Sequence, residues 1–277
     1  MQVLKTKKEV ISNLKKTKNS SIGFIPTMGA LHEGHLQLVK QSKKTCDITI
    51  VSIFVNPTQF NDPNDFVNYP NTLDLDFKQL MKLECDIVYT PSVRDLYDIG
   101  EKSKQFDFGT LTNHMEGKYR PGHFNGMATI VEKLFRIINP NKAFFGQKDL
   151  QQLQIVNALV KQINLTIEII SVPTVREKNG LAKSSRNNRL SNNEKKEGSI
   201  IYDCLRYCRL NKKQGIGKLK LYIEKKFQKQ KKITLEYMEF VSIDSMSPIT
   251  KWEDKNKSAI CIAAYINGVR LIDNIIL

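Results

Sequence analysis

The chain has 277 residues, of which 40% are hydrophobic and 26% are charged, and its mean hydropathy is −0.36. This composition excludes collagen, coiled-coil rods, disulfide-stabilised miniproteins and most disordered chains. The length suits one large domain or two modest ones. No apolar run reaches the ~18 residues of a membrane helix, and residues 1–8 lack the apolar stretch of a signal peptide. We therefore expect a soluble, cytoplasmic protein without a membrane partner.

Positive charge is concentrated in the last third of the chain. The formal net charge is +15, and residues 176–277 hold 22 basic and 11 acidic side chains. A basic chain can bind nucleic acid, an anionic surface or a polyanionic substrate. Most of the excess is lysine interleaved with asparagine and isoleucine, which a codon bias toward A and T also produces. No arginine-rich tract or aromatic RNA-binding pattern accompanies it, so we expect a solvated basic face and no nucleic-acid partner.

The five cysteines give no sign of a disulfide framework or a metal site. Their number is odd and none forms C-x-x-C. Cys204 and Cys208 are one helical turn apart, but no second Cys or His pair accompanies them. We expect them to be packing residues and assign no metal ligands.

The first two-thirds of the chain alternates between strand-like and helix-like segments. The strand-like runs are 20–25, 48–55, 86–89, 142–145 and 166–170. Helices are expected after Gly29, with Leu36, Leu38 and Val39 on the apolar side, and near 71–84, 124–139 and 149–163. The run at 48–55 is almost continuously apolar, as in a strand buried on both faces of a parallel sheet. This alternation predicts a doubly wound (Rossmann-like) parallel sheet, an α/β fold.

The pattern changes after Pro173. Residues 176–191 are polar, two helices are expected at 192–211 and 215–230, and strand-like runs follow at 236–243, 259–266 and 269–275. Helices followed by antiparallel strands indicate a separate α+β domain. We therefore predict an N-terminal domain of residues 1–175 and a smaller C-terminal lid domain of residues 176–277.

The sharpest functional signal is Pro26-Thr27-Met28-Gly29-Ala30-Leu31-His32-Glu33-Gly34-His35, between the first strand and its helix. A helix that begins there offers unpaired N–H groups and partial positive charge to a phosphate. His32 and His35 project from one side of the first turn and can stabilise charge on a phosphoryl group in transit. Gly34 removes a side chain where a nucleotide needs close approach. The alternatives are capping or packed histidines, or a zinc pair, for which further ligands at metal spacing are missing.

A second candidate, Phe145-Gly146-Gln147-Lys148-Asp149-Leu150-Gln151-Gln152, also lies where a strand ends and a helix begins. Ligands of doubly wound sheets bind outside the carboxyl ends of the strands, so we expect this turn to face the same crevice. Lys148 supplies a positive charge for phosphate, and Asp149 can cap the helix or reach ribose hydroxyls. A well-capped helix with polar surface groups is the alternative.

A third candidate, Gly180-Leu181-Ala182-Lys183-Ser184-Ser185-Arg186-Asn187, lies in the link to the C-terminal domain. Two hydroxyls between Lys183 and Arg186 form an anion clamp that could follow a triphosphate and neutralise the charge on departing pyrophosphate. A solvated linker is the alternative. If the segment faces the histidines, it acts as a lid.

Two loops carry groups suited to a small substrate. The loop at 55–60 follows the second strand, and its amides Asn56 and Gln59 suit a carboxylate or a hydroxyl rather than phosphate. The stretch at 115–126 places Arg120 and His123 in a Gly/Pro turn, which could bind phosphate or simply form a loop. An ordinary polar loop is also the alternative for 55–60.

Taken together and in this order, these segments resemble the pantoate–β-alanine ligase family. The H-x-G-H pattern alone is similar to the signature of many nucleotidylyl transferases, whereas the joint set is specific. The resemblance extends from about Gly23 to Asn274 and includes VNPTQF at 55–60, RPGHFNG at 120–126, FGQKDLQQ at 145–152, VPTVRE at 172–177, SSRN at 184–187 and RLIDN at 270–274.

The resemblance implies ATP-dependent condensation of (R)-pantoate with β-alanine through a pantoyl adenylate. It also implies a cytoplasmic homodimer and Mg²⁺ as the counterion of ATP. His35 matches the family's proton donor, Gln59 the residue that touches pantoate and β-alanine, and Gln152 the second pantoate contact. The residues implied in ATP binding are Met28, Gly29, Ala30, Leu31, His32, Glu33, Gly34, His35, Gly146, Gln147, Lys148, Asp149, Val175, Lys183, Ser184, Ser185 and Arg186.

The roles expected from the residue types agree with those that the family resemblance implies. A carboxylate is a weak nucleophile, so the expected role of the site is to hold pantoate in line with the α-phosphate. We expect His35, His32, Lys148 and Arg186 to be catalytic and Asn56 to bind substrate. A closing lid would protect the adenylate from water. Lys183 stands where the family usually has an apolar residue, which leaves its role open.

Two other functions stay possible on this sequence. A different nucleotidylyl transferase would act on a phosphate-bearing substrate, but it would need more Arg or Lys in the loop of Asn56 and Gln59. A non-enzymatic RNA-binding module is suggested only by the charge of +15. Tight RNA binding with a steep salt dependence and no ATP turnover would favour it.

Overall fold

The computed structural model describes residues 1–17, 19–60, 66–252 and 257–277. By their internal contacts these residues form two compact units. The first comprises Met1–Phe108, Arg120–Gln147 and Ile155–Pro173, and the second comprises Gly109–Tyr119, Lys148–Gln154 and Thr174–Leu277. The second unit thus includes two segments that precede residue 175. The domains 1–175 and 176–277 stay a prediction.

Strands and helices alternate through the first unit. Its strands are β1 (Gln2–Leu4), β2 (Ile22–Thr27), β3 (Ile48–Ile53), β4 (Ile87–Tyr89), β5 (Lys142–Gly146) and β6 (Glu168–Val172). Its helices are α1 (Lys7–Leu14), α2 (Glu33–Thr45), α4 (Leu73–Lys82), α5 (Val93–Leu96) and α7 (His123–Ile138), and α8 (Leu150–Gln162) has its larger part there. The structure also has short 3₁₀ turns, among them η1 (Pro57–Gln59), η3 (Gln147–Asp149) and η4 (Ser185–Arg189).

The six strands form one parallel sheet in the order β1-β4-β3-β2-β5-β6. From β2 the chain adds β3 and β4 on one side, and it then adds β5 and β6 on the other. This reversal confirms the predicted doubly wound topology. Residues 49–52 of β3 are buried, as expected for a strand covered on both faces.

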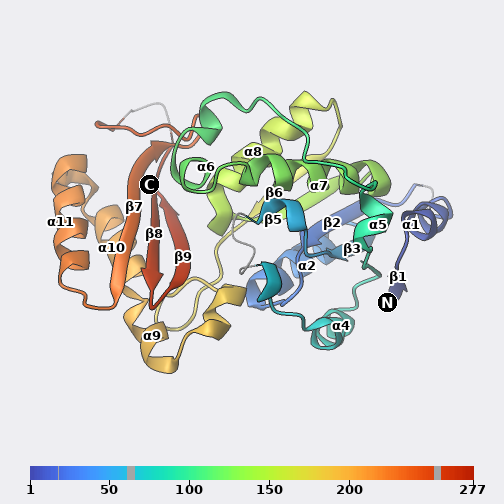
Figure 1. The fold of residues 1–277 in the computed structure, drawn as a ribbon, viewed down its shortest axis with the longest axis horizontal. Coiled ribbons are helices and arrows are strands. Elements are labelled where there is room, and N and C mark those ends of the chain that lie inside the picture. Colours follow the sequence, from blue (N-terminus) through green and yellow to red (C-terminus); the bar gives the residue numbers. More distant parts are fainter. Residues whose placement is uncertain (18, 61–65, 253–256) are drawn as a thin grey trace. The chain divides into compact units, whose positions relative to one another are not determined.

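Helices cover both faces of this sheet (Figure 1). Successive strand residues point to opposite faces, so Phe24 and Ile25 of β2 mark the two sides. The Phe24 ring meets Phe135 of α7 edge-on, with ring centroids 6.2 Å apart. Ile25 instead packs with Leu38 and Val39 of α2. The polar turns at the strand ends are therefore held by a core on each side.

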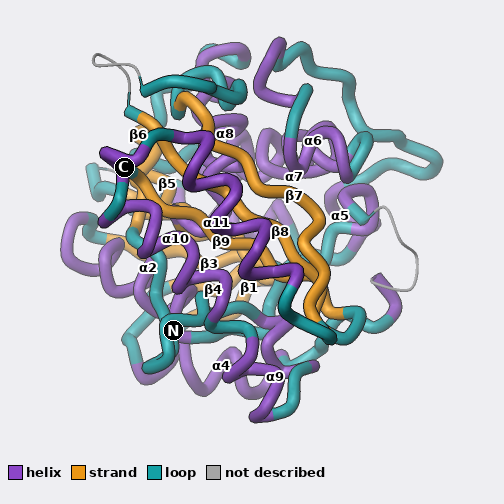
Figure 2. Tube along the Cα trace, turned by 90° about the vertical axis from the view of Figure 1, so that its left-hand side faces the viewer, coloured by secondary structure: helices purple, strands orange, loops and turns teal. Residues whose placement is uncertain are grey.

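The second unit is built on a three-stranded antiparallel sheet. Its strands, in the order β7-β8-β9, are β7 (Ile233–Ser242), β8 (Ser258–Ile266) and β9 (Val269–Ile276). Its helices are α6 (Met115–Tyr119), α9 (Asn192–Glu197), α10 (Ile200–Leu210) and α11 (Ile216–Gln228). Figures 1 and 2 both show α10 and α11 alongside the strands β7–β9. This arrangement confirms the predicted α+β character.

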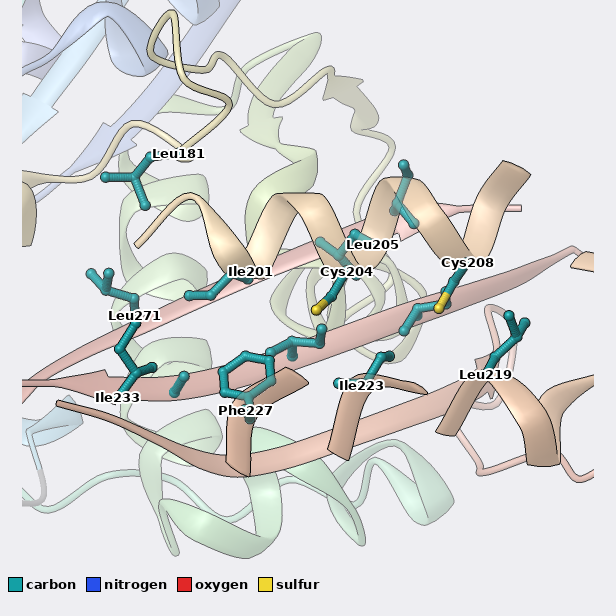
Figure 3. Packing of buried hydrophobic residues seen from close by; sticks show 14 of the residues in the cluster. Leu181, Ile201, Cys204, Leu205, Cys208, Leu219, Ile223, Phe227, Ile233 and Leu271 are labelled. Carbon is teal, nitrogen blue, oxygen red and sulfur yellow. The ribbon is translucent and has the colours of Figure 1, made fainter. Parts of the chain in front are cut away.

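Cys204 and Cys208 are packing residues, as expected. Both lie in the apolar core between α10, α11 and the sheet, where they are 1% and 0% exposed (Figure 3). Burial raises the pKa of each thiol to about 12. They therefore stabilise the second unit through contacts with apolar neighbours.

The helix predicted at 192–211 is wrong in one respect, because two helices occupy it. α9 ends at Glu197, Gly198 is its C-cap residue, and α10 begins at Ile200. A Cβ at Gly198 would lie 2.9 Å from Ile266 Cδ1, so the end of this β8 side chain packs closely against the junction. Helix periodicity does not report such a tertiary contact.

Candidate active site

Two of the predicted turns follow neighbouring strands at the point where the strand order reverses. β2 ends at Thr27 and leads into Met28–His35, and β5 ends at Gly146 and leads into Gln147. β2 and β5 are paired in parallel, so both turns leave the same edge of the sheet. Doubly wound folds bind ligands at this edge. Both turns thus begin at the same edge of the sheet, whereas their facing one crevice stays a prediction.

A buried carboxylate holds the turn before α2. Asp76 of α4 is 1% exposed, and its two carboxylate oxygens accept hydrogen bonds from the backbone N–H groups of Ala30 at 3.0 Å and Leu31 at 2.8 Å. The hydroxyl of Thr72 donates to the same carboxylate at 3.2 Å. Ala30 has φ 49°, a left-handed conformation that costs an alanine about 1–2 kcal/mol. Asp76 offsets this cost by fixing the turn.

The two histidines are held by backbone hydrogen bonds. His32 caps α2, with its Nδ1 accepting from Gly34 N–H at 3.1 Å, and His35 Nδ1 accepts from His32 N–H at 3.4 Å. The rings are stacked, with centroids 4.1 Å apart and planes 29° apart. Because each Nδ1 accepts a hydrogen bond, the neutral ring carries its proton on Nε2. His32 is therefore a capping residue of α2, which was one of the alternatives. The two backbone hydrogen bonds fix the orientations of both rings.

Gly34 has a local reason to be glycine. A Cβ at this position would lie 2.7 Å from Cε1 and 2.9 Å from Nδ1 of His32. Contacts under 3.0 Å would force the imidazole to move. The absence of a side chain at Gly34 makes room for the His32 ring. The sequence analysis had explained this glycine only by the close approach of a nucleotide.

The amides of Asn56 and Gln59 form a small buried network. Asn56 is 1% exposed and Gln59 is 9% exposed. Asn56 Nδ2 donates to Gln59 Oε1 at 3.2 Å, and Gln59 Nε2 donates to Met28 Sδ at 2.8 Å. Tyr97 donates to Asn56 Oδ1 at 2.8 Å. This network places the amide loop beside the start of the Met28–His35 turn.

The residues Arg120 and His123 support the same loop from its backbone side. His123 Nδ1 lies 2.8 Å from the carbonyl oxygen of Gln59, and Arg120 Nη1 donates to His123 Nε2 at 3.1 Å. A carbonyl only accepts and a guanidinium only donates, which fixes the ring proton on Nδ1. A Cβ at Gly126 would lie 2.2 Å from the Thr58 carbonyl oxygen, so α7 approaches this loop closely. The Gly/Pro turn therefore positions Gln59.

In the second unit, Lys148 and Asp149 belong to the η3 turn that precedes α8. The side chain of Lys148 is 17% exposed, and its ammonium lies 3.4 Å from Asp149 Oδ1. Gln151 is buried and ties α8 to the α6 region through Leu111 and His114. Gln152, the predicted pantoate contact, is half-buried. The two neighbouring glutamines thus have different environments.

The Lys183–Arg186 segment continues a short hairpin. Arg176 and Ala182 form an antiparallel bridge, and Lys183 N–H donates to the carbonyl of Val175 at 2.9 Å. The Lys183 ammonium lies 3.0 Å from Glu177 Oε2, so its charge is paired. Ser184 caps η4 by accepting from Arg186 N–H at 3.3 Å. The segment is an ordered hairpin and turn rather than the solvated linker that was its alternative.

The candidate residues therefore fall into two groups. The first unit holds Met28–His35, Gly146, Gln147, Asn56 and Gln59. The second unit holds Lys148, Asp149, Gln152, Val175 and Lys183–Arg186. That both groups meet one nucleotide stays a prediction. Sequence reasoning missed Asp76, Tyr97 and the positioning contacts of Arg120 and His123, because their partners are distant in the chain.

Among residues 1–17, 19–60, 66–252 and 257–277, no group of three or more His, Cys, Asp or Glu side chains could hold a metal ion. Within the same residues, no helix combines the length and the apolar character needed to cross a membrane.

Comparison with known proteins gives one consistent result. The family model of pantoate-beta-alanine ligase matches residues 2–276. The chain is 48% identical over 279 residues to the pantothenate synthetase of Azobacteroides pseudotrichonymphae, with 99% of each chain covered. It is 46% identical over 265 residues to that of Cytophaga hutchinsonii, with 95% of this chain and 93% of the relative covered.

Solved structures agree. The crystal structure of pantothenate synthetase from Thermus thermophilus has a TM-score of 0.93 and 34% identity, with 99% of each chain covered. That of pantoate-beta-alanine ligase from Francisella tularensis, complexed with beta-gamma ATP and beta-alanine, has a TM-score of 0.83 and 38% identity, with 99% of this chain and 97% of that chain covered. The chain therefore belongs to the pantoate–β-alanine ligase family.

Proposed function

We propose that this chain condenses (R)-pantoate with β-alanine, using ATP and releasing AMP and diphosphate. The observation that carries this proposal is the contact between Gln59 and Met28. It joins a loop of uncharged amides, suited to a small carboxylate or hydroxyl substrate, to a helix start suited to a phosphate. A carboxylate held by Gln59 would lie beside the α-phosphate that it attacks.

The first step is adenylate formation. The pantoate carboxylate attacks the α-phosphorus of ATP, the bond to the β-phosphate oxygen breaks, and diphosphate leaves. Alignment contributes much of the rate, because the carboxylate needs no covalent activation. His32 and His35, with Nε2–H groups as donors, stabilise the charge that develops on the phosphate oxygens. The backbone bonds to Nδ1 of both rings support this assignment.

We assign the departing diphosphate to the positive and hydroxyl groups of the second unit. Lys148 and Arg186 supply positive charge, and Ser184 and Ser185 supply hydroxyl donors. Asn56, Gln59 and Gln152 are proposed to hold pantoate, with Gln59 also near β-alanine. Magnesium ions would enter as the counterion of ATP, as part of the substrate.

The second step is the attack of the β-alanine amine on the pantoyl carbonyl. A new amide bond forms, AMP leaves, and the amine loses its proton. Water competes for the same carbonyl, so residues 176–277 are proposed to act as a lid during the reaction. The relatives of this chain include a ligase complexed with beta-gamma ATP and beta-alanine, which supports both ligands here. A homodimer in the cytoplasm stays part of the proposal.

Exchange of labelled diphosphate into ATP tests the first step. We expect exchange with pantoate as the sole organic substrate, because adenylate formation is reversible. Exchange that requires phosphopantetheine or nicotinamide mononucleotide instead would assign the chain to a different nucleotidylyl transfer. No exchange, together with nanomolar RNA binding, would favour the RNA-binding alternative.

A further inference from the structure

Near its end, strand β9 carries two adjacent polar residues that are almost completely buried. Asp273 and Asn274 are 4% and 3% exposed, and Ile275 beside them packs into the apolar core of the second unit. Buried polar side chains are costly unless hydrogen bonds satisfy them. Asp273 accepts from the backbone N–H of Asn274 at 2.8 Å, so the two residues form one hydrogen-bonded unit. The reaction described above uses neither of them.

Asn274 reaches the candidate phosphate-binding lysine. Its Nδ2 donates to the backbone carbonyl of Lys148 at 2.8 Å. Burial raises the pKa of Asp273, and the Lys148 ammonium is among the groups that lower it, so the two charges interact. Through these contacts β9 fixes the position of Lys148 in the η3 turn, immediately before α8.

Asp273 reaches the hairpin that carries the candidate anion clamp. Arg176 donates through Nη1 and Nη2 to the two carboxylate oxygens, the second at 3.0 Å. The guanidinium also lies 4.0 Å from the ring centre of Tyr202 and donates to the Gly180 carbonyl at 3.1 Å. Arg176 in turn pairs with Ala182, immediately before Lys183, and η4 packs against β9. A bidentate pair between an arginine and a carboxylate fixes the orientation of both side chains as well as pairing their charges.

We propose that Asp273 and Asn274 are positioning residues for ATP, which hold Lys148 and the Lys183–Arg186 segment in the arrangement that receives the triphosphate. This inference rests on the assignment of ATP to those two segments. Asn274 acts through the Lys148 backbone, and Asp273 acts through Arg176. Neither side chain touches the nucleotide in this account.

Binding of β,γ-methylene-ATP to purified protein tests the proposal without any turnover. For Asn274→Ala we expect about a tenfold weaker Kd by calorimetry, the usual consequence of leaving one buried group unpaired. The KM for pantoate should stay within about twofold of wild type. In a double-mutant cycle, Asn274→Ala should add at most about a twofold loss to Lys148→Ala, because Asn274 acts by positioning the side chain that Lys148→Ala removes.

Ile275→Val is the matched control, since it removes one methylene from the core at the neighbouring position of β9. It should lower the melting temperature and leave the Kd for the analogue unchanged. Asn274→Ser, which keeps a donor on a smaller side chain, gives a milder second variant. Wild-type affinity in folded Asn274→Ala would overturn the proposal, and so would a greater loss in Asn274→Ser than in Asn274→Ala. An equal loss of affinity in Ile275→Val would do so too, and so would full additivity with Lys148→Ala. These results concern nucleotide binding alone, so they are separate from whether pantoate is the substrate.

Discussion

Short-range hydrogen bonds orient both imidazoles of the H-x-G-H turn. His32 and His35 each accept a backbone N–H at Nδ1, which leaves Nε2 as the donor nitrogen. These backbone hydrogen bonds are sufficient to determine the tautomer, without a charged neighbouring side chain. The chemistry of the turn therefore depends on the backbone geometry that Gly34 and Asp76 maintain.

Replacing His35 with alanine should slow adenylate formation by about 10²–10³-fold, because one donor to the developing charge is lost. Its ring is only half-buried, so the fold should be retained. Diphosphate exchange measures the rate, and circular dichroism checks the fold. Unchanged exchange in a folded His35→Ala protein would remove His35 from the mechanism.

Gln59 is predicted to distinguish the two substrates. Gln59→Ala removes the amide that bonds Asn56 and Met28, so the KM for pantoate should rise by about tenfold or more. The Kd for an ATP analogue should change much less. Steady-state kinetics and calorimetry provide the two numbers. Equal losses for pantoate and nucleotide would contradict the assignment of Gln59 to the small substrate.

The chemistry-bearing residues on turns could be predicted from the sequence, whereas their supports could not. His32, His35, Asn56 and Gln59 stand directly after predicted strands, where ligands gather. Asp76 lies on a predicted helix, and nothing local shows that its carboxylate is buried against Ala30 and Leu31, far away in the chain. The same holds for His123, whose partner Gln59 is 64 residues away in the chain.

At the scale of elements, the turn between β2 and α2 depends on α4. Asp76→Asn should leave one of its two backbone donors unpaired, so we expect diphosphate exchange to fall by about tenfold. Stability should fall by about 1–3 kcal/mol for the same reason. The control is Asp74→Asn, which changes an exposed carboxylate on the same helix. If both variants exchange diphosphate at the same rate, Asp76 does not position the turn.

The buried thiols give a test of the packing in both units. Burial raises the pKa of Cys85, Cys204 and Cys208 to about 12, and it also raises the pKa of Cys261. At pH 8 a thiol of that pKa is ionised to about one part in 10⁴, and the thiolate is the reactive form. Native protein should therefore react with 5,5′-dithiobis(2-nitrobenzoic acid) at Cys46 at most, and unfolded protein at all five cysteines. Rapid reaction of two or more native thiols would contradict the described core.

The predicted helices at 124–139 and 149–163 end within one residue of α7 and α8, whereas the strand predicted at 20–25 is β2, Ile22–Thr27. The apolar run at 48–55 matches β3 because burial on both faces removes polar residues from the whole strand. β1 escaped prediction, since its three residues are mostly exposed at the sheet edge. The break between α9 and α10 was not predicted, although Gly198, the C-cap residue of α9, is an ordinary helix stop signal.

At the scale of the whole molecule, the positive charge has a simple structural setting in α11. This helix buries Leu219, Ile223 and Phe227 and exposes Lys225 and Lys226. An apolar stripe with lysines opposite is the ordinary pattern of a surface helix. The absence of a nucleic-acid partner stays a prediction.

We propose that this chain joins pantoate to β-alanine through an adenylate. Release of AMP in a coupled assay, with pantoate, β-alanine and MgATP varied one at a time, tests it most directly. We predict that AMP accumulates at a steady rate when all three are present, in a one-to-one ratio with pantothenate. Omission of pantoate or addition of excess EDTA should abolish it. Steady AMP release that is independent of pantoate, or none with all three substrates, would contradict the account.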